Sequence, residues 1–223
     1  MLKKALIVSN IFLFCCWIRP LFGAHCGVSR ERAPETARYL ALFFASGWEA
    51  IAKYPQGDLK EKIQEELVRL SGKSLEELPP ESQKVLQEAL KAVEIALFLH
   101  QRGDEKDLPR LLGRQIEVIL AFRCGIRVKQ PSLRFRDPYN RPDPWEKRFL
   151  EKFEVEVVKD RRISAKGSLE DSQYRYLYPL WVHKSCLRCH GGPQGSRDIT
   201  GHLREGYRER DLRGAVSVVL PVY

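Results

Sequence analysis

One short segment constrains this chain more than any other, the run Cys186-Leu187-Arg188-Cys189-His190. Two thiols three positions apart can each add to one vinyl group of a haem, and a histidine directly after the second thiol can bind the iron from the same side. A different spacing would strain the thioether bonds or move the histidine away from the iron. The segment therefore predicts one covalent haem c, attached at Cys186 and Cys189, with His190 as the proximal iron ligand.

Three other interpretations of this segment are open. It could be a thioredoxin-like redox pair, half of a zinc site completed by His183 or His202, or a chance occurrence. None of these gives a reason for a histidine directly after the second cysteine. We therefore favour haem attachment.

The N-terminus has the layout of a secretory signal peptide. A positively charged start precedes an apolar run over residues 5 to 18, and the small residues Gly23 and Ala24 offer a cleavage point. The run is short for a membrane span. An uncleaved N-terminal anchor stays open, because large residues lie three positions before either cleavage point. We predict a signal peptide over residues 1–24 and a periplasmic or exported protein.

The charge of the chain bears on its partners. The formal net charge of +9 falls to +6 without the signal segment, because that segment carries Lys3, Lys4 and Arg19 and no acidic residue. A mild basic excess with interspersed signs is typical of a solvated surface. We expect haem as the ligand, a redox partner protein or a membrane-bound signalling partner, and no nucleic acid.

The sulfur-containing residues limit the iron ligands. Of six cysteines, two leave with the signal peptide and two are used by the haem, which leaves Cys26 and Cys124 in an oxidising compartment. They can form a disulfide, stay as free thiols, or supply one iron ligand. The only methionine is Met1, so the mature chain cannot supply the methionine ligand of many cytochromes c.

The distal iron ligand is expected from the helical half of the chain, if a side chain binds there at all. His100 lies near the end of an apolar helical stripe, and Cys124 lies at the end of the next helix. We prefer His100, because its stripe is the face expected to pack on the sheet. A satisfied helix-end histidine is the commoner outcome for such a residue, and the sixth iron position can otherwise go to a lysine, a terminal amine, water or nothing.

Hydrophobic periodicity divides the chain in two. Apolar residues at helical spacing predict helices over residues 32–54, 58–70, 81–102 and 107–125. The second half predicts short strands and one helix, with an alternating pattern over residues 125–136 and strands over residues 155–166, 174–178 and 214–222. The helix begins after Asp143, which has Pro144 at the first helical position and Glu146 as its capping-box partner.

Three blocks of the second half resemble a known family. They are Pro131 to Glu146, Tyr176 to Gly191 and Gly206 to Val218, and they are similar to the c-type haem domain of unknown function with a PAS-like fold. The resemblance implies an α+β fold, in which a PAS-like antiparallel sheet with flanking helices holds one haem and follows a helical N-terminal region. We expect three parts, a signal peptide (1–24), a helical region (25–124) and the haem domain (125–223).

The family resemblance says little about activity, since a fold hosts many functions. Members occur as stand-alone exported proteins and as input domains of sensor kinases and cyclases. We expect a periplasmic single-haem cytochrome in electron transfer or redox response. The alternative is a haem-based sensor, and because the chain ends at Tyr223 we expect it to signal through a separate partner. An enzyme is less expected, because no acid/base constellation accompanies the haem motif.

Other polar residues are candidates for contacts around the haem. Arg134 and Arg136 alternate before a proline-rich loop and can pair with propionates, because guanidinium matches carboxylate bidentately. Surface arginines near a turn are the alternative. His183 is interpreted as a surface residue or a neighbour of the proximal side, and His202 as a solvated loop histidine.

The absence of a second methionine predicts the redox potential. The midpoint potential should fall well below that of cytochromes with histidine and methionine ligands, because nitrogen or anionic sulfur donors stabilise ferric iron. Spectroelectrochemical titration of the matured protein measures it. A clearly positive value typical of methionine ligation would contradict this expectation.

Overall fold

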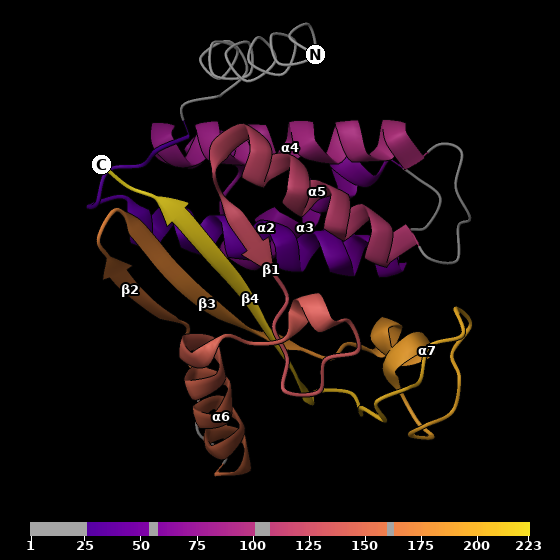
Figure 1. Ribbon diagram of the computed structural model, residues 1–223. Helices are drawn as coiled ribbons and strands as arrows, with labels where there is room; N and C mark the ends of the chain where they lie inside the picture. Colours follow the sequence, from indigo (N-terminus) through magenta and orange to yellow (C-terminus); the bar gives the residue numbers. More distant parts are fainter. Residues whose placement is uncertain (1–25, 54–57, 101–107, 160–162) are drawn as a thin grey trace, which may run out of the picture.

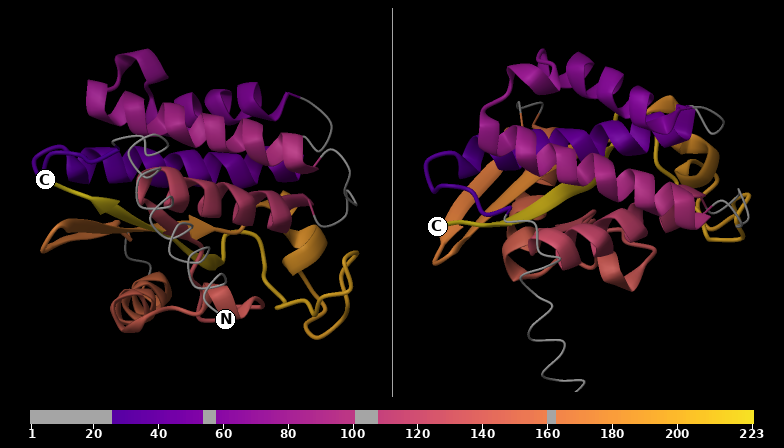
Figure 2. Two further views of the ribbon diagram at one scale, coloured as in Figure 1. Left: turned by 45° about the horizontal axis from the view of Figure 1, so that its top comes forward. Right: turned by 90° about the horizontal axis from the view of Figure 1, so that it is seen from above.

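The computed structural model describes residues 26–53, 58–100, 108–159 and 163–223. A four-stranded antiparallel sheet lies between a layer of helices and one further helix on its opposite face (Figure 1). The two additional views show the same layers, with α2, α4 and α5 on one side of the sheet and α6 on the other (Figure 2). This mixture confirms the predicted α+β class.

The sheet has the strand order β1-β4-β3-β2, with every neighbouring pair antiparallel. Its strands are β1 (Arg127–Lys129), β2 (Lys166–Glu170), β3 (Gln173–Trp181) and β4 (Leu212–Pro221). β4 is buried along almost its whole length, as its unbroken apolar run predicts. β3 and β4 therefore form the centre of the sheet. The cysteine-histidine segment over residues 186–190 follows shortly after the end of β3.

Four helices make up the layer on one face. They are α2 (Ala33–Lys53), α3 (Leu59–Ser71), α4 (Pro80–His100) and α5 (Leu108–Cys124), and they agree with the predicted helices within a few residues. α2 packs on β3 and β4, while α3, α4 and α5 pack on α2. Apolar stripes at helical spacing explain this layer, because each helix buries one side against its neighbours.

The helical region and the sheet share one hydrophobic core. The predicted boundary near residue 125 does coincide with the end of α5. The two parts nevertheless bury side chains in a single cluster, and Val28 pairs with Val222 in a parallel bridge. The cluster includes these buried residues: Leu40, Phe43, Leu86, Leu112, Val216, Val218 and Leu220.

α6 (Pro144–Val158) covers the opposite face of the sheet. The predicted capping box is present, since the Asp143 side chain accepts from the Glu146 backbone N–H and the Glu146 side chain accepts from the Asp143 backbone N–H. The predicted strand over residues 155–166 is wrong, because α6 continues through Val158 and β2 begins at Lys166. α6 buries Leu150 and Phe153 against the sheet, and this packing outweighs the strand preference of its valines.

Cys26 and Cys124 form a disulfide bond. Of the three fates left open for this pair, the structure shows the first. A sulfur in a disulfide is not available as a thiolate ligand, so Cys124 is removed from the candidates for the distal iron ligand. The bond joins the start of the described chain to the end of α5.

No helix in the described ranges is both long and apolar enough to cross a membrane. The predicted signal peptide lies outside the described residues.

The disulfide generates a prediction about stability. Replacing Cys26 and Cys124 together by serine should lower the free energy of unfolding by about 2 to 4 kcal/mol, because the bond joins residues separated by 98 positions in the sequence and so restricts the unfolded chain. Urea denaturation followed by circular dichroism measures this loss. The electron paramagnetic resonance spectrum of any bound haem should stay unchanged, and a changed low-spin signal in the double variant would restore Cys124 as a ligand.

Candidate functional site

The cysteine-histidine segment forms two short helical turns beyond the end of β3. They are η4 (Lys184–Cys186) and α7 (Leu187–His190). Backbone hydrogen bonds join Val182 to residues 210 and 211, which lead into β4. The pairing of β3 with β4 thus holds both the start of the segment and the chain that returns from it.

The two cysteines of this segment are free thiols and half-buried. His190 is also half-buried, with 25% of its side chain exposed. Its carbonyl accepts a hydrogen bond of 2.9 Å from the backbone N–H of Tyr207. One short turn of chain therefore presents two sulfur atoms and an imidazole, and its last residue is tied to the buried Tyr207.

The imidazole of His190 is held through one ring nitrogen. Nδ1 lies 3.0 Å from Oε2 of Glu205 and 3.1 Å from Nη2 of Arg136. A guanidinium has no acceptor, so of these two neighbours only Glu205 can accept a proton carried on Nδ1. Within the described part of the chain, Nε2 has no hydrogen-bond partner. The tautomer that donates to Glu205 therefore leaves the lone pair of Nε2 available to a metal.

Arg136 is the centre of this arrangement, which we call the Arg136 cluster (Arg136, His190, Asp198 and Glu205). Its Nη1 donates to Oδ2 of Asp198 at 2.6 Å, and its Nη2 donates to Oε2 of Glu205 at 2.7 Å. Nη2 also donates to the carbonyl of Cys189 at 2.7 Å, and Nε donates to Oε1 of Glu205 at 3.1 Å. The same guanidinium thus binds two carboxylates and the backbone of the motif.

The charges of the Arg136 cluster follow from burial and hydrogen bonding. Burial favours a raised pKa for both carboxyls, but hydrogen bonds outweigh it. Those from Thr200 and Arg136 hold the pKa of Asp198 well below its usual range, and those from His190 and Arg136 lower the pKa of Glu205 to about 2. Burial lowers the pKa of His190, although Glu205 opposes this change. At neutral pH the cluster therefore holds a neutral imidazole between an arginine and a carboxylate.

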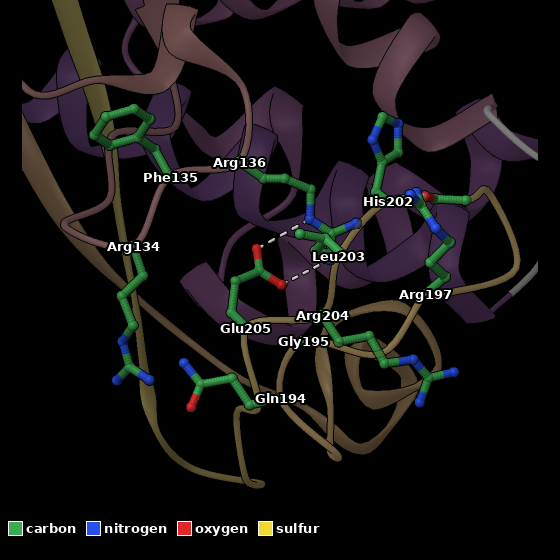
Figure 3. Close-up of a pocket in the computed structure, with 11 residues that line it drawn as sticks. Arg134, Phe135, Arg136, Gln194, Gly195, Arg197, His202, Leu203, Arg204 and Glu205 are labelled. Atoms are coloured by element: carbon green, nitrogen blue, oxygen red, sulfur yellow. Dashed lines mark hydrogen bonds and ion pairs between the residues drawn. The ribbon is translucent and has the colours of Figure 1, made fainter.

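A cavity of about 570 Å³ opens beside the cluster and shares Arg136 and Glu205 with it. Its walls come from residues 134–136 and from the loop over residues 194–205 (Figure 3). Figure 3 also shows Arg134 and Arg204 on either side of the Arg136–Glu205 pair. The cavity combines apolar wall atoms from Phe135 and Leu203 with several cationic side chains, which suits an apolar ligand with acidic groups.

The loop that forms one wall is closed by its own hydrogen bonds. Gly195 N–H donates to the Arg204 carbonyl, and Asp198 N–H donates to the His202 carbonyl. The Oδ1 atom of Asp198 accepts from the backbone N–H groups of Thr200 and His202. One carboxylate of Asp198 therefore orders the loop with one oxygen and binds Arg136 with the other.

Comparison with known proteins places the chain in a family. The family model described as Tll0287-like matches residues 30–221. The chain belongs to the Tll0287-like family. The matched region includes the helices as well as the sheet, so the family unit is larger than the blocks between residues 125 and 221 on which the resemblance was first based. This agrees with the single core shared by helices and sheet.

One solved structure is similar to this Tll0287-like chain. It is titled as the crystal structure of the cyanobacterial heme-protein Tll0287, with 22% sequence identity and a TM-score of 0.45. The match covers 65% of this chain and 97% of that chain. No curated protein is similar enough to count as a match.

The two predicted arginines have different surroundings. Arg134 lines the cavity, and its guanidinium lies 4.4 Å from the ring centre of Tyr207. Arg136 also lines the cavity, but its guanidinium already binds Asp198 and Glu205. Arg136 is therefore a less suitable propionate partner than the sequence suggested, because two carboxylates neutralise it.

The histidines considered in the sequence also have different surroundings in the structure. His183 is exposed, as expected for a surface residue. His202 lies in a loop, is half-buried and lines the cavity. His100 is the last residue of α4, and its side chain lies outside the described part of the structure.

Sequence reasoning missed Asp198 and Glu205. Both belong to a loop with many charged residues, and neither has a spacing relative to the motif that marks it as a partner of His190. A carboxylate near an iron-binding or zinc-binding histidine is a general expectation, but the chain offers several acidic residues after the motif. Only the folded loop shows which of them reach Arg136 and His190.

The residues that the structure describes contain no assembled zinc site. Among the residues that the structure describes, no three histidine, cysteine, aspartate or glutamate side chains gather as ligands for a metal ion. His183, one of the two residues considered for completing such a site, is exposed.

The ion pairs of Arg136 predict a large effect on stability. Arg136→Ala should lower the free energy of unfolding by about 3 to 5 kcal/mol, because it leaves the two buried carboxylates without their cation. Arg134→Ala is the control, since it loses only a contact with an aromatic ring, worth about 0.5 to 1 kcal/mol. Denaturant titration of both variants measures the difference, and equal losses would show that the cluster is not a stabilising unit.

Proposed function

We propose that this protein is an exported c-type cytochrome with a single covalent haem, bound through Cys186 and Cys189 with His190 as the proximal iron ligand. It acts in periplasmic electron transfer or redox response. The observation that carries the proposal is the state of His190, whose Nδ1 is held by Glu205 next to two free thiols. This is the arrangement that leaves Nε2 for a metal.

The residues present fit such a group. Cys186 and Cys189 are unpaired, while the other two described cysteines form a disulfide. The nearby cavity has a suitable size for a cofactor and is lined by Arg134, Arg197 and Arg204. Nε of Arg204 is buried without a hydrogen-bond partner among the described residues, and such an orphaned cationic donor favours an anionic ligand.

The chain contributes three actions. Cys186 and Cys189 would hold the haem through two thioether bonds, each of which would arise by addition of a thiol S–H across one vinyl group, with the hydrogen going to the neighbouring vinyl carbon and no oxidant needed. His190 would bind the iron through Nε2, while Glu205 keeps the proton on Nδ1. Arg134, Arg197 and Arg204 are the cations available to bind propionates. The bound haem iron supplies reversible exchange of one electron.

The proposal also includes a PAS-like arrangement for the sheet and its flanking helices. The supporting features are the antiparallel order β1-β4-β3-β2 and the layer of helices on one face. His100 is the remaining candidate for the distal ligand, since Cys124 is in a disulfide.

The attachment is tested by mass and spectroscopy. After export with cytochrome c maturation enzymes, the intact mass should exceed the polypeptide by one haem, and the addition should survive acid-acetone extraction. Cys186→Ser and Cys189→Ser together should abolish covalent attachment, whereas Cys26→Ser should not. Copurification of zinc without haem would contradict the proposal.

Carbon monoxide binding, measured on the same preparation, distinguishes electron transfer from haem-based sensing. Six-coordinate low-spin iron that does not react with carbon monoxide is expected for electron transfer. A ligand that is readily replaced would instead favour a haem-based sensor that signals through a separate partner.

A further inference from the structure

We propose that Glu205 is a positioning residue that sets the redox potential of the iron through His190, with Arg136 and Asp198 holding it in place. This inference rests on the proposed function, because it concerns the bond between His190 and the haem iron. It goes further, because it assigns control of the potential to a residue that lies outside the attachment motif.

The first step is the choice of tautomer. Nδ1 of His190 has a carboxylate oxygen at 3.0 Å and a guanidinium nitrogen at 3.1 Å. With the proton on Nδ1, His190 donates to Glu205 and Nε2 is a free ligand. With the proton on Nε2, Nδ1 could accept only from Nη2 of Arg136, whose two N–H groups already donate at 2.7 Å to Glu205 and to the Cys189 carbonyl. The carboxylate therefore selects the tautomer that binds iron.

The second step is the strength of the ligand. A carboxylate that accepts from the distant nitrogen of a metal-bound imidazole raises the basicity of that imidazole. A more basic imidazole and a nearby negative charge both favour ferric over ferrous iron. Glu205 should thus lower the midpoint potential below the value that His190 would give with a neutral acceptor.

The third step is the fixed position of the carboxylate. Glu205 offers both oxygens to Arg136, Oε1 at 3.1 Å and Oε2 at 2.7 Å. Its side chain is only 10% exposed. Arg136 is anchored in turn by Asp198, whose side chain is 0% exposed, and by the carbonyl of Cys189. Because Cys189 is itself an attachment point, this network ties the carboxylate to the same turn of chain as the ligand.

The surrounding charges do not cancel the carboxylate completely. Arg136 forms ion pairs with both Asp198 and Glu205, and Arg213 forms a longer ion pair of 3.8 Å with Oε1 of Glu205, without a hydrogen bond. Arg136 binds two carboxylates, so it neutralises neither of them alone. Oε2 of Glu205 therefore stays an anionic acceptor towards His190.

The experiment compares Glu205→Gln with the wild-type holoprotein. Glutamine keeps the size of the side chain and a carbonyl acceptor but removes the charge. Covalent haem should be retained, and the equilibrium constant for reduction of ferric to ferrous iron should rise about tenfold, which is a shift of about 59 mV to more positive potential. Glu209→Gln is the matched control, because Glu209 is an exposed carboxylate of the same segment, and it should leave the potential unchanged.

A second measurement separates the hydrogen bond from the charge. The Nδ1–H signal of His190, observed by NMR in the reduced low-spin protein, should lie far downfield in the wild type and move upfield in Glu205→Gln. Glu209→Gln removes an exposed charge of the same segment that lies outside the Arg136 cluster, so the signal should stay downfield. A shift in potential in Glu205→Gln with no movement of the NMR signal would overturn the inference. So would equal potentials in Glu205→Gln and Glu209→Gln.

Measurements on the wild-type protein decide two further cases, a Glu205→Gln variant that does not mature and a wild-type chain that carries no haem. If Glu205→Gln does not mature, a wild-type Nδ1–H signal at the position expected for a neutral acceptor overturns the inference, and a strongly downfield signal supports it. If the wild-type chain carries no covalent haem, the proposed function fails. The tautomer of His190 is then measured by nitrogen NMR on the haem-free chain, where a proton on Nε2 would also overturn the role of Glu205.

Discussion

The bonds of Arg136 to Asp198 and Glu205 hold together three segments that are far apart in the sequence. Arg136 lies after β1, Cys189 and His190 end α7, and the two acids lie in the loop that leads to β4. Burying charged groups costs free energy unless each finds a partner. Here every charge of the cluster has one, so the segments are stable only when all three are in place.

The sheet brings these segments to one place. β3 and β4 pair over nearly their whole length, and the motif and the cavity loop form the long connection between them. β1 pairs with the other edge of β4 and leads to Arg134 and Arg136. Gly214 helps β4 approach this region, since its φ is +145° and an added Cβ would lie 2.3 Å from the Pro131 carbonyl. The centre of the sheet thus sets the distance between the arginine and the histidine.

The helical layer supports this geometry from the other side. α2 packs across β3 and β4, and the disulfide ties the start of the described chain to the end of α5. Because helices and sheet share one core, the residues around His190 are supported by the whole molecule. This explains why the family match extends over residues 30–221 and is not limited to the segment around the motif. A rigid support of this kind is what a ligand with a fixed hydrogen bond needs.

The sequence by itself determined the local features. The apolar periodicity predicted α2 to α5, and the capping residues Asp143 and Glu146 predicted the start of α6. The spacing of Cys186, Cys189 and His190 is the basis of the haem attachment proposed here. These features depend on residues that are close together in the chain, so their pattern is visible without a fold. The end of α6 was predicted wrongly, because valines favour strands locally while contacts with the sheet decide the outcome.

Only the tertiary structure decided which distant residues meet. It joined Cys26 to Cys124 in a disulfide bond and brought Arg136 into ion pairs with two carboxylates. It also brought Glu205 within hydrogen-bonding distance of His190. Several acids and arginines near the motif were equally plausible partners in the sequence. A hydrogen bond requires an approach to about 3 Å, and that distance is set by the packing of β3, β4 and the loop between them, which no local pattern encodes.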